Sequence, residues 1–378
     1  MRVIISSIKV SSVLNDLGGK VWNPQIKWTN KYAVFVELIS DTGLSGVGEC
    51  WCFDSAPDAL IAFLRTEVLP HIVGCELNEA WAKLGDLKRR AVLTARHGIL
   101  CSASSGVDIG LWDLNAKSKN VPLWRAINAD GAGVAHLYAS GGLYGSNNTA
   151  ELLCKEMKSY IDAGFDTVKM KIGGMKIDDD IARIEAVCRS IGPNVGLIID
   201  GVYTYDQEIA LAIFSKVQHN NIIAFQSPIP AHNFSHMRNL CAQDVPVMMT
   251  EAEYRPEVFE QLIEGGSVKI LQVSPIACGG ITPLLELAER AAKVGIMLSP
   301  EISSTAVAMM AGCHLAAALE SINLVEYHMV HQVFFNHLPF STNDLKGSKV
   351  SLPNTAGLGI SLVPDNVKEE FCLNQAKN

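Results

Sequence analysis

The sequence has no cluster of basic residues. Of its 378 residues, 31 are Lys or Arg and 39 are Asp or Glu, which gives a formal net charge of −8 and an isoelectric point of about 5.7. Proteins that bind nucleic acid usually carry a basic stripe that contacts phosphates, and no run of Lys or Arg here is long enough to form one. The composition therefore predicts that nucleic acid is not a partner.

Long apolar runs are also missing. The most apolar stretch, TAVAMMAGCHLAAAL (305–319), contains His314 and is shorter than the roughly 20 residues that a membrane-spanning helix needs. The first residues, MRVIISSIKVSSV, alternate like a strand and lack the apolar segment and cleavage site of a signal peptide. We expect a cytoplasmic protein without a membrane partner.

The ten cysteines are scattered along the chain. They do not form the paired CxxC motifs of zinc sites or the dense pattern of a disulfide framework. Most are best interpreted as buried thiols.

A repeat of strand and helix begins at about residue 135. Short apolar runs rich in strand-forming residues alternate with amphipathic segments that have apolar residues at i, i+3, i+4 and i+7. The strand-like runs are VAHLYAS, FDTVKMK, VGLIID, IIAFQ, VPVMMTE, VKILQVS, GIMLSPE and INLVEY. Buried strands separated by helices predict a parallel (β/α) barrel.

At 378 residues the chain is longer than a domain with one compact core of ordinary size. We therefore expect an accessory domain beside the barrel. Residues 1–132 mix strands with helices and predict an α+β capping domain, and residues 133–335 form the barrel. We expect the loop-rich segment 340–378 to complete the capping domain, with LPNTAGLGISLV (352–363) as a strand pair.

Polar side chains stand where seven of the predicted barrel strands end, at intervals of 23 to 29 residues by subtraction of their numbers. They are Lys171, Asp200, Gln226, Glu251, Ser274, Glu301 and Glu326. The carboxyl ends of barrel strands meet at one mouth, where barrel enzymes keep their chemistry. The sequence therefore predicts one polar site made from successive strands.

Two lysines share one face of the strand TVKMK. Lys169 and Lys171 are two residues apart, so in a strand both point to the same side. Two neighbouring ammonium groups in a core repel each other and are costly to desolvate. They could instead reach solvent at the end of the strand. The polar residues at the ends of the other predicted strands favour a catalytic role for the two lysines.

Five motifs together resemble one family. DTGLSGVGE (41–49), SSGVDIGLWDLNAKSKNVPLWRAI (104–127), GFDTVKMKIGG (164–174), CGGIT (278–282) and AGLGI (356–360) are similar to the mandelate racemase and muconate lactonizing enzyme branch of the enolase superfamily. The resemblance implies an α+β capping domain over a modified (β/α)8 barrel of the (β/α)7β type. It also implies Mg²⁺ at the barrel mouth, a small carboxylate substrate and a homo-oligomer.

The resemblance assigns roles to five positions. Lys169 and Lys171 match the family's KxK pair, with Lys171 as the base, and Asp200 and Glu251 match two metal ligands. Gln226 stands where the family has a third, acidic ligand. Its amide oxygen can bind Mg²⁺ with a ligand charge of −2 instead of −3, although it could merely form a hydrogen bond within the barrel.

The chemistry explains why such residues are useful. Removing a proton next to a carboxylate leaves two negative charges on an enediolate, and a divalent cation stabilises them. A lysine base needs a pKa closer to neutrality, which a second ammonium group and a nearby cation favour.

The seventh and sixth strands depart from the family. Its racemases use a His ending the seventh strand and an Asp ending the sixth, and the matching residues here are Glu301 and Ser274. We expect Glu301 to act as an acid. The candidates for substrate binding are Trp22, Trp28, Trp51, Tyr203, Ser274 and Glu326.

These residues favour a Mg²⁺-dependent enzyme that forms a metal-stabilised enediolate from a small hydroxy or sugar acid and then eliminates water. The alternatives within the family are a racemase or epimerase, with Glu301 as the base on the opposite face, and a cycloisomerase. An alternative of another class is a barrel that has lost catalysis and only binds a ligand.

Overall fold

The computed structural model describes residues 2–52, 57–94, 97–147, 149–336 and 338–375. Its centre is a parallel barrel in which the strands lie in the order β12-β11-β10-β9-β8-β7-β5-β13. The barrel strands are β5 (Val134–Ser140), β7 (Thr167–Lys171), β8 (Gly196–Asp200), β9 (Ile222–Gln226), β10 (Val247–Met249), β11 (Ile270–Val273), β12 (Met297–Pro300) and β13 (Val325–His328). Backbone bonds between Leu298 and residues Ser321 and Asn323 close the ring from β12 to the segment before β13.

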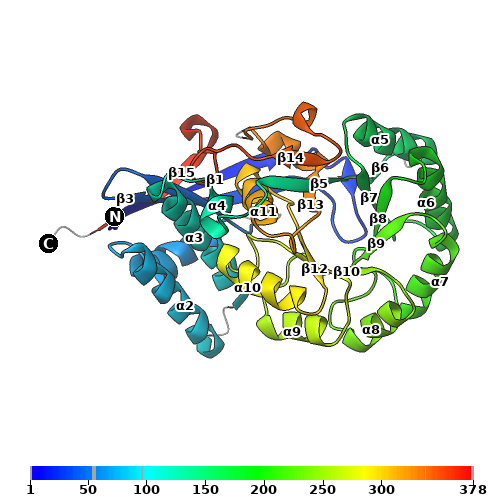
Figure 1. Cartoon of the computed structure of the whole chain (residues 1–378), viewed down its shortest axis with the longest axis horizontal. Helices are drawn as coiled ribbons and strands as arrows, with labels where there is room; N and C mark the ends of the chain where they lie inside the picture. The colour runs from blue at the N-terminus through cyan, green and yellow to red at the C-terminus, as the bar shows by residue number, and fades with distance from the viewer. Residues whose placement is uncertain (1, 53–56, 95–96, 148, 337, 376–378) are drawn as a thin grey trace.

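Helices cover the outside of the barrel, as Figure 1 shows for α5 to α9. The helices that connect successive barrel strands are α5 (Ala150–Asp162), α6 (Ile177–Ile191), α7 (Gln207–Val217), α8 (Phe234–Ala242), α9 (Pro256–Glu264), α10 (Ile281–Ala292) and α11 (Ala306–Ala318). The last strand, β13, leads into a 3-10 helix, η3 (Met329–Phe334). The expected (β/α)7β architecture is confirmed.

Alternation along the strands separates the two faces of the barrel wall. Ile198, Ala224 and Met248 belong to a small buried cluster with Tyr138, whereas Val168 belongs to the large cluster of the barrel core. Because side chains alternate along a strand, the polar residue two positions beyond each small-cluster residue faces the same way. Asp200 and Gln226 therefore lie above this inner layer, toward the carboxyl ends of the strands.

A four-stranded antiparallel sheet lies beside the barrel, in the order β15-β1-β3-β4. Its strands are β1 (Ile5–Asp16), β3 (Asn30–Ser40), β4 (Ser45–Cys50) and β15 (Lys368–Asn374), and Figure 1 shows the sheet beside α3. The helices on this side are α1 (Asp58–Phe63), α2 (Leu77–Thr94), α3 (His97–Ser118) and α4 (Leu123–Ile127), with the π-helix η1 (Leu64–Val68) and the 3-10 helix η2 (Leu69–His71). The apolar residues of the sheet and helices form a second core cluster.

The glycines of the DTGLSGVGE motif let β4 lie directly against α3. A Cβ on Gly48 would lie 1.9 Å from the carbonyl oxygen of Gly106, and one on Gly46 would lie 2.2 Å from that of Gly110. Side chains at these positions would separate the strand from the helix. The motif therefore has a packing function as well as a diagnostic one.

Two short strands connect the sheet side with the barrel. β2 (Val21–Trp22) pairs with β6 (Tyr144–Gly145), which follows barrel strand β5. β14 (Lys349–Ser351) pairs antiparallel with β5 itself, and β15 pairs with β1. The division into a capping domain, 1–132 with 340–378, and a barrel, 133–335, stays a prediction.

The predicted strand pair at 352–363 is wrong. This segment forms an isolated bridge between Gly357 and Pro122, and the strand that joins the antiparallel sheet is β15. Gly357 and Gly359 have φ values of 72° and 71°, which are incompatible with extended strands. Asp113 of α3 accepts a hydrogen bond from the backbone of Leu358 at 2.7 Å, which holds the segment in this irregular path.

The remaining elements are the 3-10 helices η4 (Thr342–Asp344) and η5 (Pro364–Asn366). Among the described residues, no helix is both long and apolar enough to cross a bilayer.

Candidate active site

Six ionisable side chains meet at the carboxyl ends of the barrel strands. Two are the lysines of β7, and the others are carboxylates that end or follow strands β8, β10 and β12 or lie within β13. The set is Lys169, Lys171, Asp200, Glu251, Glu301 and Glu326. Glu251 is half-buried and the other five are buried. Charged groups are rarely buried unless they are paired or functional, so this cluster is the candidate site.

Lys171 is paired with Asp200. Its Nζ atom lies 2.5 Å from Asp200 Oδ2, and the two residues are also direct partners in the pairing of β7 with β8. The other oxygen of Asp200, Oδ1, accepts a hydrogen bond from the backbone of Val202 at 3.0 Å. Asp200 thus holds the Lys171 ammonium group at the barrel mouth.

Lys169 lies deeper and contacts several acceptors. Its Nζ atom lies 2.6 Å from Glu326 Oε1 and 2.9 Å from Gln226 Oε1, with Asp200 Oδ2 at 3.8 Å. Burial would lower the pKa of Lys169, but the Glu326 and Asp200 carboxylates outweigh burial and raise it. Lys169 therefore remains an ammonium group.

Gln226 connects the lysine pair to Glu251. Its Oε1 atom accepts from Lys169 and its Nε2 atom donates to Glu251 Oε2 at 3.0 Å. An ammonium group can only donate and an ionised carboxylate can only accept, so these neighbours together determine which way the amide points. The amide fits a position between a cation and an anion, which a glutamate would not.

Glu301 and Glu326 differ in their ionisation. Burial raises the pKa of Glu301 to about 8, and the charges of Glu326 and Glu251 add to this effect. Burial also disfavours the charged form of Glu326, but Lys169 and Lys171 lower its pKa below the usual range. The environments push the two pKa values apart, which is how one site provides an acid beside an ionised carboxylate.

The Oε2 atom of Glu301 is buried and has no hydrogen-bond partner among the described residues. Glu301 immediately follows β12, and its backbone N–H donates to Val273 of β11 at 3.1 Å. The backbone is thus held by the neighbouring strand while one carboxyl oxygen stays available. Ser274, which follows β11, is also fully buried, and its hydroxyl has no partner within the described ranges.

The donor atoms and the charge balance bear on whether Mg²⁺ suits the site. No group of three or more His, Cys, Asp or Glu side chains in the described parts of the chain is arranged to hold a metal. The predicted set contains only two carboxylates, Asp200 and Glu251, with the Gln226 amide between them. All three offer the hard oxygen atoms that Mg²⁺ prefers.

Negative charge exceeds positive charge around these oxygens. Asp200, Glu251 and Glu326 share the two barrel lysines, while the raised pKa of Glu301 keeps this fourth carboxyl group protonated at neutral pH. A divalent cation would reduce this excess. The donor chemistry and the charge therefore fit Mg²⁺, with a ligand set weaker than three carboxylates.

The predicted aromatic residues lie at different places around the mouth. Trp28 is buried with its ring centroid 5.4 Å from that of His328, and Lys31 Nζ lies 5.1 Å from the ring centroid of Trp51. Trp22 stacks on Tyr144 at 4.7 Å. The structure thus brings Trp28 to the end of β13, whereas Trp22 packs on the β6 segment.

Tyr203 follows Asp200 in a turn and is half-buried. Its backbone N–H donates to the carbonyl of Ser227 at 2.7 Å, and its φ of 60° is unusual for a tyrosine. Burial and then the charge of Glu251 raise its pKa well above the usual range, so its hydroxyl stays protonated beside the site.

The position of Glu326 differs slightly from the expected one, because it lies inside β13 rather than at its end.

Four polar residues of this region are not among the predicted site residues. Tyr138 accepts a hydrogen bond from Gln272 at 2.9 Å across the barrel, and its oxygen lies 3.5 Å from Lys169 Nζ. His328 and His331 follow Glu326 and are fully buried. Alternation could have found Gln272 and His328, because each is two residues from a predicted site residue on the same strand face.

Glu49 joins the antiparallel sheet to the loop that follows Glu301. It accepts hydrogen bonds from the Ser304 hydroxyl, the Thr305 hydroxyl (2.6 Å) and the backbone N–H of Ala308 (3.1 Å). Burial raises the pKa of Glu49, and the nearby Lys31 opposes this. The carboxyl group therefore ties β4 to the beginning of α11.

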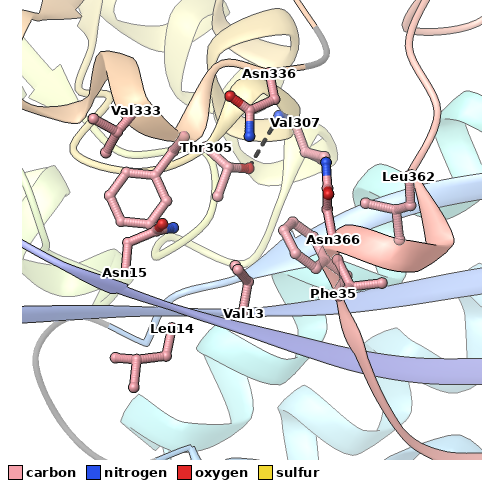
Figure 2. Close-up of a pocket in the computed structure, with 12 residues that line it drawn as sticks. Val13, Leu14, Asn15, Phe35, Thr305, Val307, Val333, Asn336, Leu362 and Asn366 are labelled. Carbon is pink, nitrogen blue, oxygen red and sulfur yellow. Dashed lines mark hydrogen bonds between the residues drawn. The ribbon is translucent and has the colours of Figure 1, made fainter.

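A separate cavity of about 240 Å³ lies between β1, β3 and the segments around residues 305, 334 and 362–367. Figure 2 shows Val13 and Phe35 on one side of it, with Val333, Asn336 and Leu362 around the rim. The predicted site residues are not among those that line it. The candidate active site is therefore the buried polar cluster and not this cavity.

Two family matches cover most of the chain. Residues 27–127 match the mandelate racemase / muconate lactonizing enzyme N-terminal domain, and residues 153–366 match the family described as enolase C-terminal domain-like. The second match alone covers more than half of the chain. The protein belongs to the mandelate racemase and muconate lactonizing enzyme family of the enolase superfamily.

Relatives of similar length have named enzymatic activities. The chain is 26% identical over 340 residues to arabinonate dehydratase of Saccharolobus solfataricus, which covers 89% of this chain and 90% of that protein. It is 26% identical over 364 residues to L-talarate/galactarate dehydratase of Salmonella typhimurium, covering 96% and 88%. Other relatives are named as a cycloisomerase and an epimerase, so the named relatives include lyases and isomerases.

The solved structures agree on the fold. L-talarate/galactarate dehydratase from Salmonella typhimurium, liganded with Mg and L-lyxarohydroxamate, superposes with a TM-score of 0.87 at 24% identity. The superposition covers 100% of this chain and 95% of that chain. Magnesium is thus bound by a protein of the same fold.

Proposed function

We propose that the protein removes the proton next to the carboxylate of a small hydroxy or sugar acid and then eliminates water. The observation that carries this proposal is the buried pair Lys169 and Lys171, which lies among three buried carboxyl groups and the half-buried Glu251 at the barrel mouth. Such a costly arrangement is typical of a site that handles protons and anions. Relatives named as dehydratases support the same reaction.

We further propose that Asp200, Gln226 and Glu251 hold one Mg²⁺ ion. When bound, the cation supplies electrostatic stabilisation of the negative charge that develops on the substrate carboxylate. The three side chains come from successive strands, and Gln226 already lies within hydrogen-bond distance of Glu251. Gln226 would have to turn its oxygen toward the ion, which gives up the hydrogen bond that it accepts from Lys169 and the one that it donates to Glu251.

Lys171 is the base in this proposal. It lies at the end of β7, with Asp200 as its partner at 2.5 Å. Only a neutral amine can accept a proton, so Lys171 must separate from Asp200 before it acts as the base.

Lys169 and Glu326 bind rather than transfer protons. Lys169 keeps its charge because carboxylates raise its pKa, so it is suited to holding a substrate carboxylate oxygen. Glu326 orients Lys169 through their 2.6 Å contact and accepts a bond from the backbone of Ile302 at 3.2 Å. These contacts keep the ammonium group in place throughout the reaction.

Glu301 is the acid. Lys171 takes the α-proton, the electron pair of that C–H bond forms a carbon–carbon double bond, and the C–O bond to the β-hydroxyl breaks. Glu301 gives its proton to the departing hydroxyl, which leaves as water, and the enol product tautomerises to a 2-keto acid. A pKa raised to about 8 keeps Glu301 protonated at neutral pH.

The test is a screen of hydroxy and sugar acids in deuterated water with added Mg²⁺. Proton NMR measures exchange at the α-carbon, and mass spectrometry measures loss of water. The proposal predicts a substrate that shows both, and both must be lost in Lys171→Ala. Exchange at no α-carbon in any acid, with Mg²⁺ bound, contradicts the proposal.

A second candidate is racemisation or epimerisation, with Glu301 as the base on the opposite face. Relatives named as epimerases support it, and a cycloisomerase relative supports ring opening or closure. The same screen separates these reactions, because epimerisation inverts the α-carbon and retains the hydroxyl groups. The raised pKa of Glu301 favours the acid role, since a base must be ionised.

A barrel that only binds its ligand is the alternative of another class. Gln226, Ser274 and Glu301 depart from the family pattern and leave this alternative open, whereas the lysine pair argues against it. A titration with Mg²⁺ and acids that shows binding without α-proton exchange would support it.

We also propose that the chain forms a homo-oligomer, as the family resemblance implies.

A further inference from the structure

Two histidines lie next to the candidate site without a role in the proposed reaction. His328 is two residues beyond Glu326 in β13, so both side chains leave the same face of the strand. His331 lies in η3, and its ring stacks on that of His328 with centroids 4.2 Å apart. Trp28 covers both rings, at 5.4 Å and 5.0 Å.

The nitrogen atoms of these rings are buried and unsatisfied. Both ring nitrogens of His331 and the Nδ1 atom of His328 have no hydrogen-bond partner among the described residues. His314, the third fully buried histidine, is different, because its Nδ1 accepts from Trp124 and its Nε2 lies 3.2 Å from the Leu358 carbonyl. An unsatisfied buried polar atom is unfavourable, so three within one stacked pair indicate a ligand.

The protonation state of the two histidines limits which ligands they can bind. Burial lowers the pKa of His328 and of His331 well below the usual range, and the positive charge of Lys171 adds to this effect at both rings. Both rings are therefore neutral near pH 7, and each offers one donor and one acceptor. A hydroxyl group also donates and accepts, so it matches a neutral imidazole better than a carboxylate does.

A second carboxylate in this place would meet like charge. Glu326 is ionised, on the same strand face as His328. Three lysines, Lys169, Lys171 and Lys31, also act on the rings. Lys169 and Lys171 are paired with Glu326 and Asp200, and Lys31 acts on Glu49 and Glu301, where it opposes the rise in their pKa. These positive charges are thus shared by carboxyl groups of the protein.

We propose that His328 and His331 form a subsite that binds hydroxyl groups on the part of the substrate remote from its reacting carboxylate. This rests on the proposed function and assigns its substrate class. The substrate is an aldonate, a polyhydroxylated acid with one carboxylate, and not an aldarate with a carboxylate at each end. Trp28, which packs against both rings in a tilted arrangement, closes the subsite from the capping side.

Binding measurements test the subsite without depending on turnover. Isothermal titration calorimetry with Mg²⁺ compares aldonates with the aldarates of the same configuration, over several sugar configurations. We expect the best aldonate to bind at least about tenfold more tightly than its aldarate, and an analogue lacking the terminal hydroxyl to bind more weakly. Tighter binding of aldarates, or no binding of any aldonate, overturns the inference.

Variants connect that preference to the histidines. His331→Phe keeps a ring for stacking and should weaken aldonate binding by about tenfold, whereas His331→Gln, which retains a donor and an acceptor, should recover most of it. His328→Phe should resemble His331→Phe. The control is His236→Phe, an exposed histidine of α8, which should bind as the native protein does. Thermal unfolding of each variant verifies that it is folded.

The outcomes distinguish this inference from the proposed function. Unchanged aldonate affinity in a folded His331→Phe protein overturns the subsite, whatever the reaction is. α-Proton exchange with aldarates alone also overturns it and leaves the proposed function intact. Histidine-dependent binding of aldonates with no α-proton exchange supports the subsite and contradicts the proposed function.

Discussion

The Nζ atom of Lys171 lies 2.5 Å from Oδ2 of Asp200, so the proposed base and a proposed metal ligand form one ion pair. The two residues are neighbours across the β7–β8 pairing, which makes this contact a direct result of strand register. A cation at Asp200 would compete with the Lys171 ammonium group for the same carboxylate, so metal binding and this ion pair are coupled.

The first prediction concerns that lysine. Lys171→Ala should reduce α-proton exchange by roughly 10²- to 10⁴-fold, the usual contribution of a positioned acid or base. Mg²⁺ affinity should not fall, because the substitution removes a positive charge beside Asp200. Exchange is measured by NMR in deuterated water and metal affinity by calorimetry.

Lys158 provides the control for this experiment, since it is an exposed lysine on α5. Lys158→Ala should exchange the substrate proton as fast as the native protein. Native exchange rates in Lys171→Ala would remove Lys171 from the reaction and shift attention to another base.

The second prediction concerns the amide at the metal site. Gln226→Glu should bind Mg²⁺ about tenfold more tightly, because it restores a full negative charge to the ligand set. Without metal the same variant should unfold at a lower temperature than the native protein. The new carboxylate would then face Glu251, to which the Gln226 amide now donates a hydrogen bond.

Gln272→Glu is the matched control, because Gln272 is another buried glutamine inside the barrel and contacts Tyr138 rather than a proposed ligand. It should leave Mg²⁺ affinity close to native. Equal affinities of native and Gln226→Glu proteins would mean that Gln226 is not a metal ligand, and no binding by the native protein would reject the site itself.

Much of the fold could be predicted because alternation and strand ends are local properties. Lys171, Asp200 and Gln226 end β7, β8 and β9 as expected, since each apolar run stops at a polar residue. Glu251 and Glu301 come just after their strands, and Glu326 lies inside one. Hydrogen bonding between neighbouring strands decides these endings, and that information is not local.

The contacts within the site could not be predicted from the sequence as well as the fold could. The orientation of Gln226 depends on Lys169 and Glu251, which lie 57 and 25 residues away along the chain. The approach of Trp28 to His328 and His331 depends on how the two halves of the chain pack. Distances of this kind result from tertiary structure, so periodicity and motifs could indicate the residue types but not their partners.

The third prediction concerns the connection between the antiparallel sheet and the barrel. Glu49→Ala should lower the free energy of unfolding by about 2–5 kcal/mol, because it leaves the buried donors of Ser304, Thr305 and Ala308 without their acceptor. Glu37→Ala, on the half-buried part of β3, is the comparison and should have a much smaller effect. Denaturant unfolding measures both, and equal losses would show that Glu49 has no special role in joining the two parts.

The last prediction concerns Glu301 and has a pH dependence. Glu301 is protonated in the folded protein up to a pKa of about 8, whereas its usual pKa is 4.5. Between these values the unfolded chain binds fewer protons than the folded one, so the ionisable group destabilises the fold increasingly as pH rises from about 4.5 to about 8. Glu301→Gln cannot ionise, and in metal-free protein its advantage in thermal unfolding midpoint should therefore grow from pH 5 to pH 8.

The same variant separates the two proton transfers. Glu301→Gln should retain α-proton exchange, which requires Lys171, and should lose formation of the 2-keto acid, because an amide cannot protonate the departing hydroxyl. In the native protein, product formation should decline as pH rises through about 8, where Glu301 loses its proton. If exchange and product formation fall together by the same factor in Glu301→Gln, Glu301 belongs to substrate binding or to the first proton transfer. If the difference in stability between native protein and Glu301→Gln does not change with pH, the buried carboxyl group is ionised in the folded protein.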